Sequence, residues 1–291
     1  MIDFIKYSRL YFVFSGILIL TSIVFLSLWG LRFGIDFTGG TLLEVEFIKQ
    51  RPAISDLRKT ISEKIQSDFT LQEIGEKGVI LRAKEISEET HQKIIESLGG
   101  EEKVREKRFE MIGPSIGREL KKGAITALVL GFLFIIVYIA FAFRRVSRPV
   151  PSFKYGLAAL IALFHDILIT CGIFAFLGRF FNIEVNTPFA AALLTILGYS
   201  INDTIVVFDR CRENLIKSEG GFKEILNRSL SQSIARSLFT SLSTLLVLFA
   251  VLFLGGETLF SFSLALIVGI ILGTYSSIFI ATPILFRFYK R

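Results

Sequence analysis

The sequence predicts a polytopic α-helical membrane protein with six transmembrane helices and one α+β domain inserted between the first and second of them. Its 291 residues are 52% hydrophobic with a mean hydropathy of +0.60, more apolar than a soluble domain of this length requires. Six segments reach the roughly 20 apolar residues that cross a bilayer core. The one long connection between them is polar and alternates in pattern, which indicates a folded domain rather than a linker.

The six apolar segments follow one another along the chain. They cover residues 11–29, 124–143, 155–177, 189–208, 238–254 and 260–286. The first follows Lys6 and Arg9, so a cleavable signal peptide is an alternative to a membrane helix. Its apolar core is longer than that of a signal peptide, and no small-x-small cleavage site precedes LRFGIDFTGG. We therefore expect residues 1–30 to hold the N-terminus and a retained first transmembrane helix.

The inserted segment, residues 31–123, is predicted to fold in the order β-α-β-β-α-β, which is that of a ferredoxin-like domain. Strands are expected at 36–48, 69–75, 78–86 and 103–113, and helices at 52–65 and 87–100. Within the first strand Leu43, Val45 and Phe47 alternate as a buried face. Within the second helix Ser87 is the expected cap, and we expect the side chain of His91 to be solvated. Such a fold does not by itself indicate a function.

The location of the net charge of +7 predicts the orientation in the membrane. The inserted segment contains as many acidic as basic residues, so the excess lies elsewhere. The second connection contributes Arg144, Arg145, Arg148 and Lys154, and the fourth contributes Arg210, Arg212, Lys217, Lys223 and Arg228. The third and fifth connections contain only Arg179, Glu184 and Glu257. The positive-inside rule then places both termini in the cytoplasm and the inserted domain outside. Topology explains the basic excess better than nucleic-acid binding does.

Residues 124–291 should form one bundle of five helices, because only short loops join them. In the sixth span Gly269, Gly273 and Ser277 recur at four-residue spacing, which is typical of close helix packing and less typical of a ligand site.

Ionisable residues inside the spans are the candidate functional residues, since a carboxylate in a bilayer costs roughly 2.5–3.5 kcal/mol on insertion scales. In the fourth span Tyr199, Asn202 and Asp203 should share one helix face. Asp203 lies about 8 Å inside the cytoplasmic end by helical rise. Arg236, at the start of the fifth span, should lie at a similar depth. The proton affinity of Asp203 would then depend on whether Arg236 is near, so a conformational change in their distance would be a proton-binding cycle.

Each of these residues also has a structural interpretation. Asp203 and Arg236 could form a static salt bridge, although intramembrane ionisable groups favour a pathway. His165 and Asp166, midway along the third span, could be a second relay, or Asp166 could simply bond His165 and Thr170. The hydroxyls in the fifth span indicate contact between helices more often than a water-lined channel. These hydroxyls belong to Thr240, Ser243 and Thr244.

No motif indicates an enzyme. The sequence has no Gly-rich phosphate loop ending in Lys-Ser/Thr, no HExxH, and no Cys/His spacing for a metal. Cys171 and Cys211 are expected at opposite ends of their helices, so a disulfide between them is not predicted. We expect no cofactor other than a coupling ion, H⁺ or Na⁺.

Four motifs together resemble the SecD/SecF family, in its SecF branch, within the resistance-nodulation-division superfamily. FGIDFTGGT carries Asp36, Gly39 and Gly40 of the family signature, and ALFHDILIT carries the His-Asp pair. GYSINDTIVVFDRCREN, beginning at Gly198, is the most specific, and QSIARSLFTSLSTLL contains Arg236. The resemblance covers the whole chain, and no departure from it removes an ionisable group.

The resemblance implies a multi-pass protein of the bacterial cytoplasmic membrane that, with SecD, helps the SecYEG translocon export preproteins using the proton-motive force. It implies that Asp203 and Arg236, with Asn202 beside them, form part of the ion pathway. Two alternatives stay open: a small-molecule exporter of the same superfamily, and a scaffold subunit that moves no ions.

Overall fold

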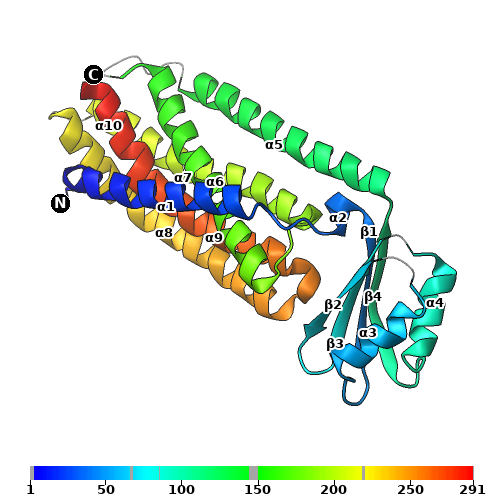
Figure 1. The fold of residues 1–291 in the computed structure, drawn as a ribbon. Helices are drawn as coiled ribbons and strands as arrows, with labels where there is room; N and C mark the ends of the chain where they lie inside the picture. Colours follow the sequence, from blue (N-terminus) through cyan, green and yellow to red (C-terminus); the bar gives the residue numbers. More distant parts are fainter. Residues whose placement is uncertain (1–2, 66–67, 85, 144–149, 218–219, 291) are drawn as a thin grey trace. The chain divides into compact units, whose positions relative to one another are not determined.

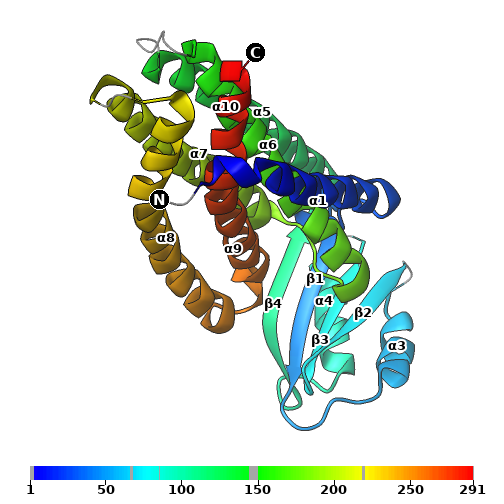
Figure 2. The same ribbon diagram turned by 90° about the vertical axis from the view of Figure 1, so that its left-hand side faces the viewer.

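The structure, a computed structural model, describes residues 3–65, 68–84, 86–143, 150–217 and 220–290. It divides the chain into two compact units (Figures 1 and 2). The membrane unit comprises Met1–Arg32 with Ala124–Arg291, and the outer unit comprises Phe33–Gly123. Arg144, Arg145 and Arg148, which the sequence predicts in the second connection, lie outside the described residues.

Six helices of the described chain are long and apolar enough to cross a membrane, which confirms the predicted number of spans. The first five are α1 (Ser8–Leu28), α5 (Pro114–Ala142), α6 (Ser152–Phe181), α7 (Thr187–Lys217) and α8 (Phe222–Leu254). Most extend beyond the predicted apolar segments because polar turns at their ends stay helical. In α7, the last helical residue is Lys217 rather than Phe208.

The sixth span is not one uniform α-helix. It consists of α9 (Glu257–Ser276), a π-helical turn η2 (Ser277–Ala281) and α10 (Thr282–Lys290). Pro283 offers no backbone N–H to the preceding turn, which favours a local change of hydrogen bonding. The Thr282 hydroxyl donates to the Ser277 carbonyl at 3.1 Å. The π turn begins at Ser277, directly after Ser276, which is the last residue of α9.

The stripe of small residues in the sixth span makes the predicted close helix contact, and the helix that it contacts is α7. A Cβ added at Gly269 would lie 2.3 Å from Ile196, and one added at Gly273 would lie 2.9 Å from the Cβ of Ser200. Helix α9 also contacts α6 and α8, so it lies at the centre of the bundle (Figure 1).

The outer unit contains a four-stranded antiparallel sheet in the order β2-β3-β1-β4 (Figure 2). Its elements are α2 (Ile35–Thr38), β1 (Gly40–Phe47), α3 (Ile54–Ser62), β2 (Phe69–Ile74), β3 (Gly78–Ala83), α4 (Glu88–Ser97) and β4 (Val104–Ile112). The four strands and the helices α3 and α4 each fall within a predicted segment, although their bounds are shorter. Helix α2 was not predicted, and it occupies the start of the segment expected to be the first strand. The side chains of Leu43, Val45 and Phe47 lie in the core, as expected from their alternation.

Gly39 and Gly40 are needed where β1 meets the start of α5. Their φ angles are +73° and +130°, a region that favours glycine. A Cβ at Gly39 would lie 2.7 Å from the Cα of Pro114, and one at Gly40 would lie 2.7 Å from the carbonyl oxygen of Ala83. The glycine pair therefore serves close backbone packing within the outer unit.

The expectation that His91 is solvated was wrong. Its side chain is buried, stacks on Phe109 at a centroid distance of 3.8 Å, and lies between two acids. Nδ1 is 3.1 Å from Glu88 and Nε2 is 3.0 Å from Glu106. Glu106 belongs to β4, and only the folded sheet brings it next to α4.

Candidate functional site

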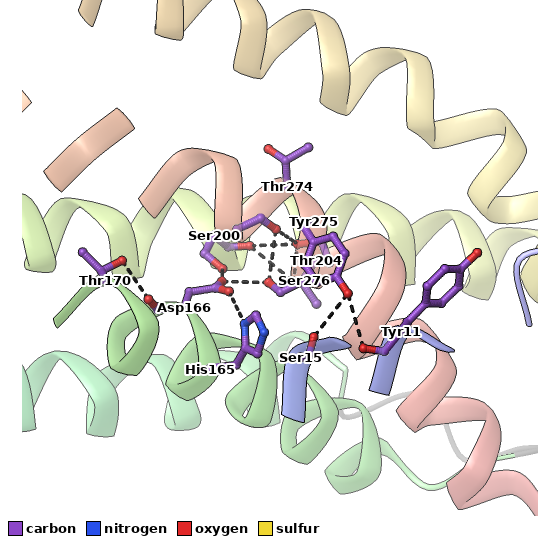
Figure 3. Close-up of polar contacts among 12 residues, drawn as sticks. Tyr11, Ser15, His165, Asp166, Thr170, Ser200, Thr204, Thr274, Tyr275 and Ser276 are labelled. Atoms are coloured by element: carbon purple, nitrogen blue, oxygen red, sulfur yellow. Dashed lines mark hydrogen bonds and ion pairs between the residues drawn. The ribbon is translucent and has the colours of Figure 1, made fainter. Parts of the chain in front are cut away.

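Asp166, at the middle of α6, is fully buried and its carboxylate is hydrogen-bonded from three directions (Figure 3). Oδ1 lies 2.8 Å from Nδ1 of His165. Oδ2 accepts from the hydroxyl of Ser200 on α7 at 2.6 Å and from that of Ser276 on α9 at 2.7 Å. The carboxylate therefore joins three helices of the bundle.

The network continues from Asp166 along the contact of α7 with the π turn. Ser277 donates to the carbonyl oxygen of Ser200 at 3.4 Å, and its hydroxyl lies 2.8 Å from that of Thr204. The Thr170 hydroxyl donates to the backbone carbonyl of Asp166 at 2.8 Å and not to its carboxylate. The bond between His165 and Asp166 that the sequence suggested is thus present, whereas the one from Thr170 reaches a different atom.

His165 connects this network to the side of the bundle formed by α1. Its ring lies 6.1 Å from that of Tyr275, nearly parallel to it. The Tyr275 hydroxyl accepts from Ser15 at 3.2 Å and donates to the carbonyl of Tyr11 at 3.4 Å (Figure 3). Nε2 of His165 is buried without a hydrogen-bond partner in the described chain.

Asp203, on α7, is 4% exposed and is held quite differently. Its Oδ2 has no hydrogen-bond partner among the described residues, and neither does the buried hydroxyl of Ser237. The side chains of Ser237 on α8 and Thr274 on α9 lie close enough to act on the charge of this carboxylate, without a hydrogen bond to Oδ2. A buried carboxylate oxygen without a donor is rare in proteins and can accept a proton or bind a cation.

Arg236 and Asn202 lie at the surface of the membrane unit. No ion pair within 4.0 Å joins Arg236 to Asp203 in the described part of the chain, so the static salt bridge is not the arrangement present here. Asn202 is exposed although Asp203 is buried, and Tyr199 is half-buried. The expected common face of α7 is therefore divided between the interior and the surface.

The three hydroxyls of α8 selected from the sequence bond to their own helix. Thr240 donates to the Arg236 carbonyl at 2.9 Å, and Ser243 and Thr244 both donate to the Thr240 carbonyl. Ser241, which the sequence analysis did not select, lies 2.6 Å from Thr274 on α9. The residues predicted to connect helices therefore bond within α8, and their buried neighbour makes the contact between helices.

The sequence predicted Asp166 and Asp203 as candidate residues but did not predict the hydroxyls that bond to Asp166. Ser200 and Ser276 belong to α7 and α9, and only packing brings them to Asp166. One signal was available: Ser229, Ser233, Ser237 and Ser241 recur every four residues along α8. Such spacing places side chains on one helix face.

Two family models match the chain. The model described as "Protein export membrane protein SecD/SecF, C-terminal" matches residues 91–291, and the "SecD/SecF GG Motif" matches residues 30–47. The second match includes Gly39 and Gly40, whose close packing is described above.

Curated relatives and a solved structure are similar over nearly the whole chain. The protein translocase subunit SecF of Thermobaculum terrenum is 41% identical, over 98% of this chain and 93% of its own. That of Vibrio alginolyticus is 39% identical, over 97% and 88%. The crystal structure of SecDF, a translocon-associated membrane protein from Thermus thermophilus, superposes with a TM-score of 0.86 at 32% identity. The match covers 100% of this chain but 39% of that longer chain.

Proposed function

This chain belongs to the SecD/SecF family of protein export membrane proteins, and from this premise we propose that it uses the proton-motive force, together with a SecD partner, to complete preprotein translocation. The family supports an accessory, non-enzymatic role in Sec export. The use of an ion gradient is our proposal, and the geometry of Asp203 is the observation that carries it.

A SecD partner is proposed because this chain corresponds to 39% of the SecDF chain that it resembles. We propose SecD as the source of the remainder of such an assembly. Helices α1 and α5 are mostly exposed, which leaves apolar surface for a partner or for lipid. We further propose that the pair acts at SecYEG on exported preproteins, in the bacterial cytoplasmic membrane.

The orientation and the class of the outer unit are also proposals. The charge distribution supports cytoplasmic termini and an outer unit on the periplasmic side. The order β-α-β-β-α-β, with sheet order β2-β3-β1-β4, supports a ferredoxin-like class for that unit.

In the proposed cycle Asp203 alternately binds and releases the coupling ion, H⁺ or Na⁺. Its unpartnered Oδ2 gives the ion a place to bind without displacing a protein donor. Arg236 lies on the neighbouring helix and is free to approach or leave as the helices move. Each elementary charge that crosses 100 mV releases about 2.3 kcal/mol, enough to bias a two-state movement. Asp166 and His165 are proposed to hold the helices or to act as a second relay.

Movement could reach the outer unit through α5, which runs without interruption from Pro114 to Ala142. The first part of this helix belongs to the outer unit and the rest to the membrane unit. We propose that a shift of the helices alters how the outer unit holds an emerging polypeptide.

The test is export by the reconstituted chain and its SecD partner, with and without an ion gradient. Asp203→Asn should abolish gradient-dependent stimulation while the partners still co-purify. Asp56→Asn, on the exposed surface of α3, is the matched control and should leave stimulation unchanged. Normal stimulation by Asp203→Asn would contradict the proposal. Wild-type stimulation that ignores the gradient would instead support a scaffold, and drug efflux would support a small-molecule exporter.

A further inference from the structure

Four buried serines form a continuous face of α8. Ser229, Ser233, Ser237 and Ser241 recur every four residues, and each is at most 4% exposed. With a rise of 1.5 Å per residue, successive hydroxyls lie about 6 Å apart along the helix. Neighbours at this spacing are too far apart to bond directly, and a short chain of waters can bridge them.

The two outer serines of this face are fully engaged with protein groups. Ser229 accepts from Asn214 at 2.9 Å and donates to the Ile225 carbonyl at 2.7 Å. Ser241 lies 2.6 Å from the hydroxyl of Thr274 and accepts from Tyr199 at 3.3 Å. Neither hydroxyl is available for a moving ion.

The two inner serines differ from them. Ser237 has no hydrogen-bond partner in the described chain, and it lies beside Asp203, whose Oδ2 also has none. Ser233, one turn away, lines a polar pocket between α7 and α8. On this face of α8, the hydroxyls that are not bonded to protein groups among the described residues are therefore those of Ser233 and Ser237, between the pocket and Asp203.

The pocket has a volume of about 200 Å³, which is room for several waters. Its lining includes two acids, Asp209 and Glu213, and two bases, Arg210 and Arg236. Asp209 pairs with Arg212 at 2.6 Å, and Glu213 pairs with Arg210 at 2.6 Å. The acidic and basic side chains that line the pocket balance, so its net charge does not exclude a cation.

We propose that this pocket is the port through which Asp203 exchanges its ion with the solution on the Asp209 side of the membrane, with Ser233 and Ser237 as the polar steps between them. The proposal rests on the proposed function of Asp203 and adds its access route. For a proton, hydronium in the pocket gives a proton to Ser237 Oγ while the Ser237 hydroxyl proton passes through a bridging water to Asp203 Oδ2, since no direct hydrogen bond joins these two atoms in the described chain. Water, a neutral serine and a protonated carboxyl result. Arg236, at the same pocket, is then placed to repel an incoming cation or to move aside.

The access route can be tested without measuring export. Ser233→Cys, Ser237→Cys, Ser229→Cys and Ser241→Cys are made singly, and each chain with its SecD partner is placed in vesicles of both orientations. A charged, membrane-impermeant thiol reagent is applied, and the wild type provides the background from Cys171 and Cys211. We expect labelling above background for Ser233→Cys and Ser237→Cys, only from the Asp209 side. Ser229→Cys and Ser241→Cys should remain at background. No labelling of Ser233→Cys, or equal labelling from both sides, would overturn the port.

Ion flux in the reconstituted pair tests the chemical role of Ser237. Ser237→Ala should slow substrate-stimulated flux by about tenfold, less than a positioned proton-transfer group usually contributes, because water can replace the hydroxyl. Ser237→Thr retains a hydroxyl and should restore the flux, and Ser229→Ala is the control. Wild-type flux in Ser237→Ala, when Asp203→Asn carries none, would overturn this step and leave the proposed function standing. Normal ion flux in Asp203→Asn, together with labelling of Ser233→Cys and Ser237→Cys, would show that the pocket is open to the solution but does not supply ions to Asp203.

Discussion

Two acids lie buried in the membrane unit, Asp166 on α6 and Asp203 on α7. The oxygens of Asp166 are occupied by His165, Ser200 and Ser276. Oδ2 of Asp203 has no donor among the described residues. A carboxylate whose acceptors are filled can take up a cation only if a donor leaves, whereas one with a free acceptor can do so at once. The same residue type at similar burial therefore suits a fixed junction in one place and an exchange site in the other.

The largest expected effect separates the acids by stability. Asp166→Ala should lower the free energy of unfolding by about 3–5 kcal/mol, the range for removing one partner of a buried network. Asp203→Ala should cost far less, because Oδ2 of Asp203 has no hydrogen-bond partner among the described residues. Thermal unfolding of the purified pair with SecD measures both variants. Equal losses would end the distinction between the two acids.

The next prediction perturbs Asp166 through its neighbour Ser200. Gly273→Ala places a Cβ 2.9 Å from that of Ser200, and overpacking of this kind costs about 1–3 kcal/mol. Gly198→Ala is the matched control, because a Cβ at Gly198 meets nothing within 4 Å. It should be neutral or slightly stabilising in a helix. If Gly198→Ala lost as much stability as Gly273→Ala, the loss would not be specific to the contact between Gly273 and Ser200.

Removing single hydroxyls compares the two sites directly. Ser276→Ala deletes one donor to Asp166 and should cost about 1.5–3 kcal/mol, as for a hydrogen bond to a charged group. Ser237→Ala deletes a hydroxyl without a partner and should change stability by less than about 0.5 kcal/mol. The same unfolding assay distinguishes them, and a larger loss for Ser237→Ala would reverse our interpretation.

A third acid, Asp3, provides the smallest effect and a reference outside the membrane. The hydrogen bond from Lys223 lowers the pKa of Asp3, helped by Asn227 and the Lys6 backbone N–H. A lowered folded-state pKa gives stability that is present above the unfolded pKa, about 3.9, and is lost as the pH falls below it. Since both partners are exposed by more than a third, we expect less than about 1 kcal/mol.

Unfolding of Asp3→Asn and of the wild type at two pH values checks this prediction. The wild type should be slightly more stable at pH 7, and the difference should shrink as the pH falls below about 3.9 and vanish only below the lowered pKa of the folded state. A difference that grows on acidification would have the wrong sign.

The spans, the outer strands and the acids could be predicted from the sequence because each leaves a local pattern. Hydropathy marks a span, alternation marks Leu43, Val45 and Phe47, and an acid in an apolar segment is conspicuous by itself. The partners of the acids leave no such pattern. Ser200 and Ser276 are separated by many residues, and they meet Asp166 only through the packing of α6, α7 and α9.

Burial within an amphipathic element was equally hard to predict. His91 lies on a polar helix, and Glu106 and Phe109 enclose it only after β4 has joined the sheet. Asn202 and Asp203 are adjacent in sequence, yet one is exposed and the other buried, because the boundary of the bundle passes between them. Periodicity predicts which residues share a face and does not predict what covers it.

The π turn at Ser277–Ala281 gives the sixth span one residue more than a regular α-helix would hold over the same length. Ser276 thereby reaches Asp166 while Ser277 reaches Thr204. Shortening the chain by one residue here would rotate α10 by about 100° about its axis. Arg287, whose guanidinium lies 4.4 Å from the Phe12 ring, would then turn away from α1. The extra residue of the π turn thus determines which face of α10 contacts α1.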